Sequence, residues 1–268
     1  QTHADYFVQD GFGVVHRAHA STDAITRFLP SVAGLLLEKE VATIREAMHS
    51  REHPLVAVLG GAKVSDKIPV IKALIPIADT IVLAGAMANT FLAHQRVRLG
   101  RSKVEDGQDA IIDEIYALAE EKVGKAQVKD FLISPTDLGV GTSIEPTATR
   151  RDVSVHAVTS DMLALDIGPQ SVAKMLEKVH AAKTVIWNGT LGMCEVLAFR
   201  EASIQLASAL TGHDAPKSLI GGGDTSDFVI NWDERHGDSF PYISTGGGAS
   251  LELMSGAKLP GVETLLDA

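Results

Sequence analysis

The sequence predicts an α/β protein built as a three-layer α/β/α parallel-sheet, Rossmann-like domain. Short apolar, β-branched runs alternate with helical periodicity along most of the chain, and the runs end in glycine or another turn residue. Strands that are apolar on both faces are typical of a buried parallel sheet. Ligands bind such sheets at the carboxyl ends of the strands, so we expect several glycine turns to line one crevice.

The predicted elements follow this alternation in chain order. A strand at 6–8 and a helix at 36–49 precede the regular array, which indicates the tail of a preceding domain and a connecting helix. The polar segment 140–155 is expected to form a surface hairpin. The remaining strands are predicted at 55–59, 80–83, 131–133, 162–165, 184–187 and 219–220. Helices are predicted at 88–95, 109–123, 169–180 and 195–210, and two more are expected to begin at about 65 and at 226.

Composition narrows the function classes. The 268 residues carry 24 Lys+Arg against 34 Asp+Glu, a net charge of −10, and show no basic block, which argues against nucleic-acid binding. The longest apolar region, 68–91, is interrupted by Lys72, Pro76 and Asp79, so no membrane span is expected. A single cysteine, Cys194, fits a reducing cytosol and predicts a cytoplasmic location.

The run Gly221-Gly222-Gly223-Asp224-Thr225 follows an apolar stretch and precedes a predicted helix. Glycines at a strand-to-helix turn let backbone N–H groups approach an anion, and the helix N-terminus adds partial positive charge. The aspartate fits if Mg²⁺ bridges it to phosphate, because Mg²⁺ takes one or two carboxylates plus phosphate oxygens. The run predicts a metal–nucleotide site; the alternative is a tight turn with a helix cap.

A second candidate is Gly60-Gly61-Ala62-Lys63-Val64-Ser65-Asp66-Lys67. Two lysines four residues apart at a helix start are predicted to share one face beside the backbone donors of a glycine turn. Such a set suits several phosphate charges. The alternative is a pair of solvated surface lysines.

These segments together resemble the phosphoglycerate kinase family over the whole chain. The matching runs, in the family's order, are Asp10 to His19, Gly60 to Lys67, Trp187-Asn188-Gly189, Gly221 to Thr225 and Ser244 to Ser250.

The resemblance implies glycolytic, reversible phosphoryl transfer between 1,3-bisphosphoglycerate and MgADP, giving 3-phosphoglycerate and MgATP, in a monomeric parent enzyme with Mg²⁺ as cofactor. It implies that Lys63, Gly222 and Gly223 act on the migrating group, while Asp224 holds the metal and Thr225 donates to phosphate. The nucleotide-binding residues that it implies are Gly61, Ala62, Lys63, Lys67, Gly85, Leu165, Asn188, Glu195, Gly222, Gly223, Asp224 and Thr225.

Arg17 is the residue that the resemblance assigns to the phosphate of phosphoglycerate. The implied division is a remnant of the substrate lobe at 1–35, an interdomain helix and hinge at 36–53, a nucleotide-binding domain at 54–240 and a segment returning to the first lobe at 241–268. Much of the substrate lobe precedes Gln1 in the family pattern. A truncated polypeptide that binds nucleotide but is nearly inactive alone is therefore expected.

Departures from the family pattern leave the base preference open. Ala84, Ala86 and Ala164 stand where family members commonly carry glycine, near the implied adenine slot. The rival interpretation is a non-catalytic Rossmann-type nucleotide or dinucleotide-binding module. It fits the strand–helix alternation, but the chain lacks a complete G-x-G-x-x-G, and this interpretation gives no reason for the lysine pair or Asp224.

Overall fold

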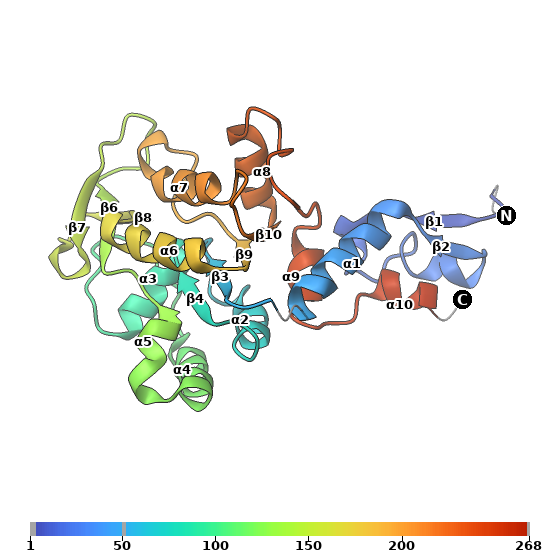
Figure 1. The fold of residues 1–268 in the computed structure, drawn as a ribbon, viewed down its shortest axis with the longest axis horizontal. Coiled ribbons are helices and arrows are strands. Elements are labelled where there is room, and N and C mark those ends of the chain that lie inside the picture. Colours follow the sequence, from blue (N-terminus) through green and yellow to red (C-terminus); the bar gives the residue numbers. More distant parts are fainter. Residues whose placement is uncertain (1–3, 50–51, 267–268) are drawn as a thin grey trace.

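The computed structural model describes residues 4–49 and 52–266. The expectation of a truncated polypeptide concerned Gln1, which lies outside the described residues. Figure 1 shows a larger part around a central sheet and a smaller part that holds both ends of the chain.

The strands are β1 (Phe7–Gln9), β2 (Ser31–Ala33), β3 (Leu55–Leu59), β4 (Thr80–Leu83), β5 (Leu132–Ile133), β6 (Asp137–Gly141), β7 (Arg151–Ser154), β8 (Leu163–Ile167), β9 (Thr184–Asn188) and β10 (Lys217–Gly221). The α-helices are α1 (Leu35–His49), α2 (Ile68–Leu74), α3 (Gly85–His94), α4 (Asp109–Val123), α5 (Val128–Phe131), α6 (Pro169–Ala181), α7 (Glu201–Ala209), α8 (Gly223–Trp232), α9 (Gly248–Met254) and α10 (Pro260–Leu266).

The predicted three-layer α/β/α architecture is confirmed. Five strands form a parallel sheet in the order β10-β9-β3-β4-β5. On β3, Leu55, Ala57 and Leu59 face the core that α2 to α5 cover, whereas Val56 and Val58 face the core that α6 to α8 cover. Successive side chains of a strand point to opposite faces, so both faces of this sheet are buried and the strand is apolar throughout.

The strand register brings the glycine turns to one edge. Leu59 at the end of β3 pairs with Asn188 at the end of β9, and Asn188 pairs with Gly221 at the end of β10. The turns that follow these three strands therefore start at the same level of the sheet.

The strand predicted at 162–165 lies outside the parallel sheet. It is β8, which extends to Ile167 and pairs antiparallel with β6 in a three-stranded sheet, β7-β6-β8. The predicted hairpin is the β6–β7 pair of this sheet. Apolar content alone does not separate a central parallel strand from the edge of a small antiparallel sheet, because both contain a short buried run.

Two helix predictions need correction. The continuous helix predicted at 195–210 is divided into a 3-10 helix, Leu197–Phe199, and α7, which begins at Glu201. The Asp166 carboxylate caps the first turn of α7 by accepting the Ala202 N–H at 3.2 Å. The helix predicted from 226 begins at Gly223. Among the described residues, no helix is long and apolar enough to cross a membrane.

The smaller part joins the two ends of the sequence. β1 pairs in parallel with β2, a strand that the sequence analysis missed. The buried carboxylate of Glu40 on α1 accepts hydrogen bonds from Ser244 Oγ (2.8 Å) and from the Thr245 N–H (2.7 Å). Gly261 N donates to Val15 O at 2.9 Å. The segment from about 241 thus packs on elements within residues 4–49 (Figure 1), while the domain boundaries themselves stay a prediction.

Candidate functional site

The glycine turns after β3, β4 and β9 contact one another directly through backbone atoms. Gly60 N donates to Asn188 O at 2.9 Å, and Gly61 N donates to Thr190 O at 2.9 Å. Gly85 N donates to Leu191 O at 3.0 Å. Three separate turns are therefore held together as one unit at the carboxyl edge of the sheet.

This contact leaves no room for side chains at two of the positions. A Cβ on Gly60 would lie 2.2 Å from Thr190 O. A Cβ on Gly189 would lie 2.3 Å from the carbonyl carbon of Gly60, and Gly189 also has φ +95°. Packing therefore requires glycine at both positions, and backbone conformation also requires it at Gly189.

A cavity of about 490 Å³ opens beside these turns, a size in the range of small-molecule sites. Six of the predicted residues line it: Gly61, Ala62, Gly85, Leu165, Glu195 and Asp224. The lining residues that the site prediction did not include are Ala86, Arg101, Lys103, Ile144, Leu163, Ala164, Thr190, Gly192 and Met193.

Some of the missed residues carried a signal. Gly192 and Met193 closely follow the Trp187-Asn188-Gly189 run and could have been included with it. Arg101 and Lys103 come from the loop between α3 and α4, where no motif marked them. They bring two positive charges to a cavity whose carboxylates are Glu195 and Asp224.

Lys67 and Asn188 meet beside the glycine turns and outside the cavity lining. The Lys67 ammonium donates to Asn188 Oδ1, and the two residues are 7% and 0% exposed. Burial lowers the pKa of Lys67 to about 8, while the carboxylates of Asp66 and Asp224 act in the opposite direction. Asn188 Nδ2 is buried and lacks a hydrogen-bond partner among the described residues, so this amide has a donor available for a ligand.

The predicted helical pair of Lys63 and Lys67 is wrong. α2 begins only at Ile68, with Pro69 in its first turn, and residues 63–67 form an irregular turn. Lys67 is buried, whereas Lys63 is exposed and is absent from the cavity lining. Proline fixes the start of the helix after Lys67, so the two lysines cannot share a helix face.

The glycine run forms the predicted strand-to-helix turn. Gly222 has φ +97° and directly precedes α8, which begins at Gly223. Asp224 is exposed, and Thr225 is fully buried, where its Oγ1 accepts the Gly189 N–H at 2.8 Å. Its own O–H proton stays available to donate.

Arg17 lies in the smaller part of the molecule, away from the cavity lining. It is exposed, and its Nε donates to His16 Nε2 at 3.3 Å. His16 in turn lies beside Gly248 at the start of α9, where an added Cβ would be 3.3 Å from His16 Nε2. Arg17 therefore sits near the second glycine run, Gly246-Gly247-Gly248.

A self-contained metal centre is not part of this site. Among residues 4–49 and 52–266 no group of three or more His, Cys, Asp or Glu side chains could hold a metal ion. Asp224 is a single exposed carboxylate. That donor set fits Mg²⁺ delivered with a phosphate ligand, because Mg²⁺ commonly uses one or two carboxylates and completes its shell with phosphate and water.

A larger cavity, of about 810 Å³, lies between α3 to α5 and the antiparallel sheet. None of the predicted site residues lines it. Gly61 and Gly85 of the glycine turns line the smaller cavity, and the buried Lys67 lies next to Gly61, so the smaller cavity is the stronger candidate.

Comparison with known proteins identifies relatives. The family model described as "Phosphoglycerate kinase" matches residues 1–257. The phosphoglycerate kinases of Moorella thermoacetica and Streptococcus uberis are 41% and 43% identical over 98% and 97% of this chain. The chain spans 65% and 63% of their lengths. The phosphoglycerate kinase structure from Coxiella burnetii has a TM-score of 0.86 at 34% identity, over 98% of this chain and 66% of that one.

Gly189→Ala should lower the free energy of unfolding by about 3 kcal/mol, because strain at positive φ adds to a steric overlap with Gly60. Urea unfolding followed by tryptophan fluorescence measures this loss. Gly107→Ala is the matched control, because Gly107 has φ +74° but open space around its Cβ position. We expect it to cost about 1 kcal/mol. Equal losses in the two variants would contradict the packing argument.

Proposed function

This chain belongs to the phosphoglycerate kinase family, and we propose that its cavity at the carboxyl edge of the parallel sheet binds the magnesium complex of ADP or ATP. The observation that carries the proposal is that glycine-turn residues and the Asp224 carboxylate line this cavity, while the buried Lys67 lies behind Gly61, with its Cε 3.8 Å from where a Cβ on Gly61 would be. Backbone N–H groups and an ammonium favour phosphates, and the carboxylate favours a bridging cation.

The roles proposed for individual residues are those that the resemblance to the family implies. Gly85 and Leu165 would flank the base, and Glu195 would accept from the ribose hydroxyls. Asp224 would hold Mg²⁺, and Thr225 would donate to a phosphate oxygen. The remaining phosphate donors in this proposal are Ala62, Lys63, Lys67, Asn188, Gly222 and Gly223. Gly61, whose N–H donates to Thr190 O, would contact the nucleotide without donating a hydrogen bond.

The reaction proposed is reversible phosphoryl transfer between 1,3-bisphosphoglycerate and MgADP, with 3-phosphoglycerate and MgATP as products. Such transfer depends mainly on positioning and on electrostatic stabilisation of the migrating group. Lys63 supports this role because it is exposed beside the glycine turn and free to move toward the group in flight. Arg17, beside the second glycine run, is proposed to bind the phosphate of phosphoglycerate. Glycolysis and a cytoplasmic location stay predictions.

Calorimetric titration with ADP, with and without Mg²⁺, tests the nucleotide site. We expect one Mg²⁺-dependent site and a loss of at least about tenfold in affinity for Asp224→Ala. Asp227→Ala, one turn further along α8 and outside the cavity lining, should bind like the unmodified chain. Failure of a folded sample to bind MgADP would refute the proposal, and Mg²⁺-independent binding of NAD would favour a dinucleotide-binding module.

Nucleotide affinity should fall as pH rises through the pKa of Lys67, which is about 8. Below that pH Lys67 is positive, and bound phosphates favour the charged form; above it the ammonium loses its proton and its attraction for phosphate. The dissociation constant should rise up to about tenfold per pH unit above 8. Titrations across this range provide the measurement. Lys67→Gln should give a flat profile. Lys72→Gln is the control: Lys72 on α2 is half-buried, pairs with Glu114 and lies outside the cavity lining, so its profile should be unchanged. A flat profile for the unmodified chain would contradict the role of Lys67.

We further propose that these 268 residues bind nucleotide but turn over negligibly by themselves. The chain spans about 65% of its relatives' length, and Arg17 is the single phosphoglycerate contact that the resemblance assigns to it. A coupled assay with 3-phosphoglycerate and ATP, run beside the full-length Moorella thermoacetica relative, measures the difference. Turnover comparable to that of the relative would overturn this prediction.

A further inference from the structure

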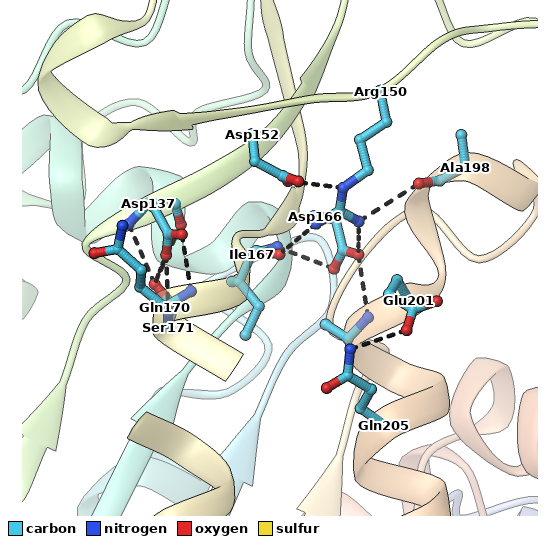
Figure 2. Close-up of polar contacts among 11 residues, drawn as sticks. Asp137, Arg150, Asp152, Asp166, Ile167, Gln170, Ser171, Ala198, Glu201 and Gln205 are labelled. Atoms are coloured by element: carbon cyan, nitrogen blue, oxygen red, sulfur yellow. Dashed lines mark hydrogen bonds and ion pairs between the residues drawn. The ribbon is translucent and has the colours of Figure 1, made fainter. Parts of the chain in front are cut away.

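Figure 2 shows a polar network around Arg150. None of its residues lines the cavity, but Asp166 directly follows Leu165, which does. Arg150 directly precedes β7, and its side chain is 16% exposed. Its Nη1 donates to Asp166 Oδ2 at 2.6 Å, and its Nη2 donates to Ile167 O at 3.0 Å. Nη1 also lies 3.4 Å from Ala198 O, and Nε donates to Asp152 Oδ1 at 2.8 Å. One guanidinium thus joins three segments of the chain.

Asp166 is the centre of this network. Its side chain is fully buried in β8. Besides Arg150, its Oδ2 accepts the Ala202 N–H in the first turn of α7, and its Oδ1 accepts the Ile167 N–H at 2.9 Å. The carboxylate therefore ties β8 to the helix that follows the loop 190–199 (Figure 2).

The same loop forms one wall of the nucleotide cavity. Gly192 packs against Asp166 so closely that an added Cβ would lie 2.5 Å from Asp166 Oδ1. Met193 N donates to Leu165 O at 2.8 Å. The loop supplies Thr190, Gly192, Met193 and Glu195 to the cavity lining, and β8 supplies Leu163, Ala164 and Leu165.

We propose that Arg150 and Asp166 are positioning residues for the nucleotide: their ion pair holds the loop 190–199 against β8 and so sets the spacing of the two cavity walls. Neither side chain lines the cavity, so both act through the residues that do. This inference rests on the proposed function, because it assumes that a nucleotide occupies the space between these walls.

The physical chemistry of the pair supports a positioning role. Burial raises the pKa of Asp166 to about 6, and the Arg150 guanidinium opposes that rise, so the carboxyl is ionised at neutral pH. Displacing one partner of a buried pair leaves an uncompensated charge, which neighbouring segments must move to solvate. The planar guanidinium reaches Asp166 and Ile167 together, a geometry that the single ammonium of lysine does not reproduce.

Gly139 offers a way to displace the guanidinium without changing any charge. A Cβ on Gly139 would lie 2.6 Å from Arg150 Cζ, the far end of a flexible side chain that must then shift. Gly139→Ala is therefore the main variant, and Arg150→Lys is the second. Arg151→Gln is the control, because Arg151 is the exposed neighbour on β7.

The experiment combines MgADP calorimetry with amide hydrogen exchange. Gly139→Ala and Arg150→Lys should raise the MgADP dissociation constant about tenfold. They should also speed exchange at Met193 N, bonded to Leu165, and at Leu191 N, bonded to Ser203, while Ile186 in β9 keeps its protection. Arg151→Gln should change neither measurement.

Three results would overturn the inference: unchanged MgADP affinity in both variants, unchanged exchange at Leu191 and Met193, or exchange that rises equally throughout the sheet. The last result would mean that the pair contributes only to global stability. If the unmodified chain does not bind MgADP, the proposed nucleotide function fails by itself. The exchange data would then still show whether the pair holds the loop.

Discussion

The structure depends on the contact between the backbones of three glycine turns, at Gly60, Gly85 and Gly189. The N–H groups of Gly60, Gly61 and Gly85 donate to the carbonyl oxygens of residues 188, 190 and 191, and these bonds hold the ends of β3, β4 and β9 together. Any Cβ at these glycines would overlap a neighbouring backbone atom. Because backbone polar groups must be paired when buried, the turns satisfy one another and hold Gly61, Ala62 and Gly85 in the cavity lining. The sheet edge thus becomes a rigid platform for an anionic ligand.

One buried charge, Lys67, and one exposed carboxylate, Asp224, lie beside this platform. Lys67 is held by the Asn188 side chain directly under the turns, and Asp224 and Thr225 come from the first turn of α8. Burial disfavours the charged form of Lys67 and so lowers its pKa. A bound phosphate would stabilise that charge and offset the cost of burying it. The site therefore combines fixed backbone donors with one side chain whose charge a ligand would stabilise, an arrangement suited to phosphoryl groups.

Two further polar clusters attach the surrounding segments to this platform. Arg150 and Asp166 join the small antiparallel sheet to the loop 190–199, and Glu40 joins α1 to the residues that precede α9. Each carboxylate is buried and accepts several hydrogen bonds. Contacts of this kind fix orientation as well as add stability, because a buried charge tolerates few alternative arrangements.

The sequence by itself determined the layered α/β architecture, the strand ends and the glycine turns, because strand apolarity and glycine placement are local signals. It also marked six of the residues that line the cavity. Only the tertiary structure decided that β8 belongs to a separate antiparallel sheet, that Lys63 and Lys67 lie in different environments, and that Arg101, Lys103 and Met193 join the lining. These features depend on strand pairing and on side chains that meet across long sequence separations. Arg150 and Asp166 show the reason most clearly: sixteen residues apart, they form one ion pair only because β7 and β8 flank the same strand.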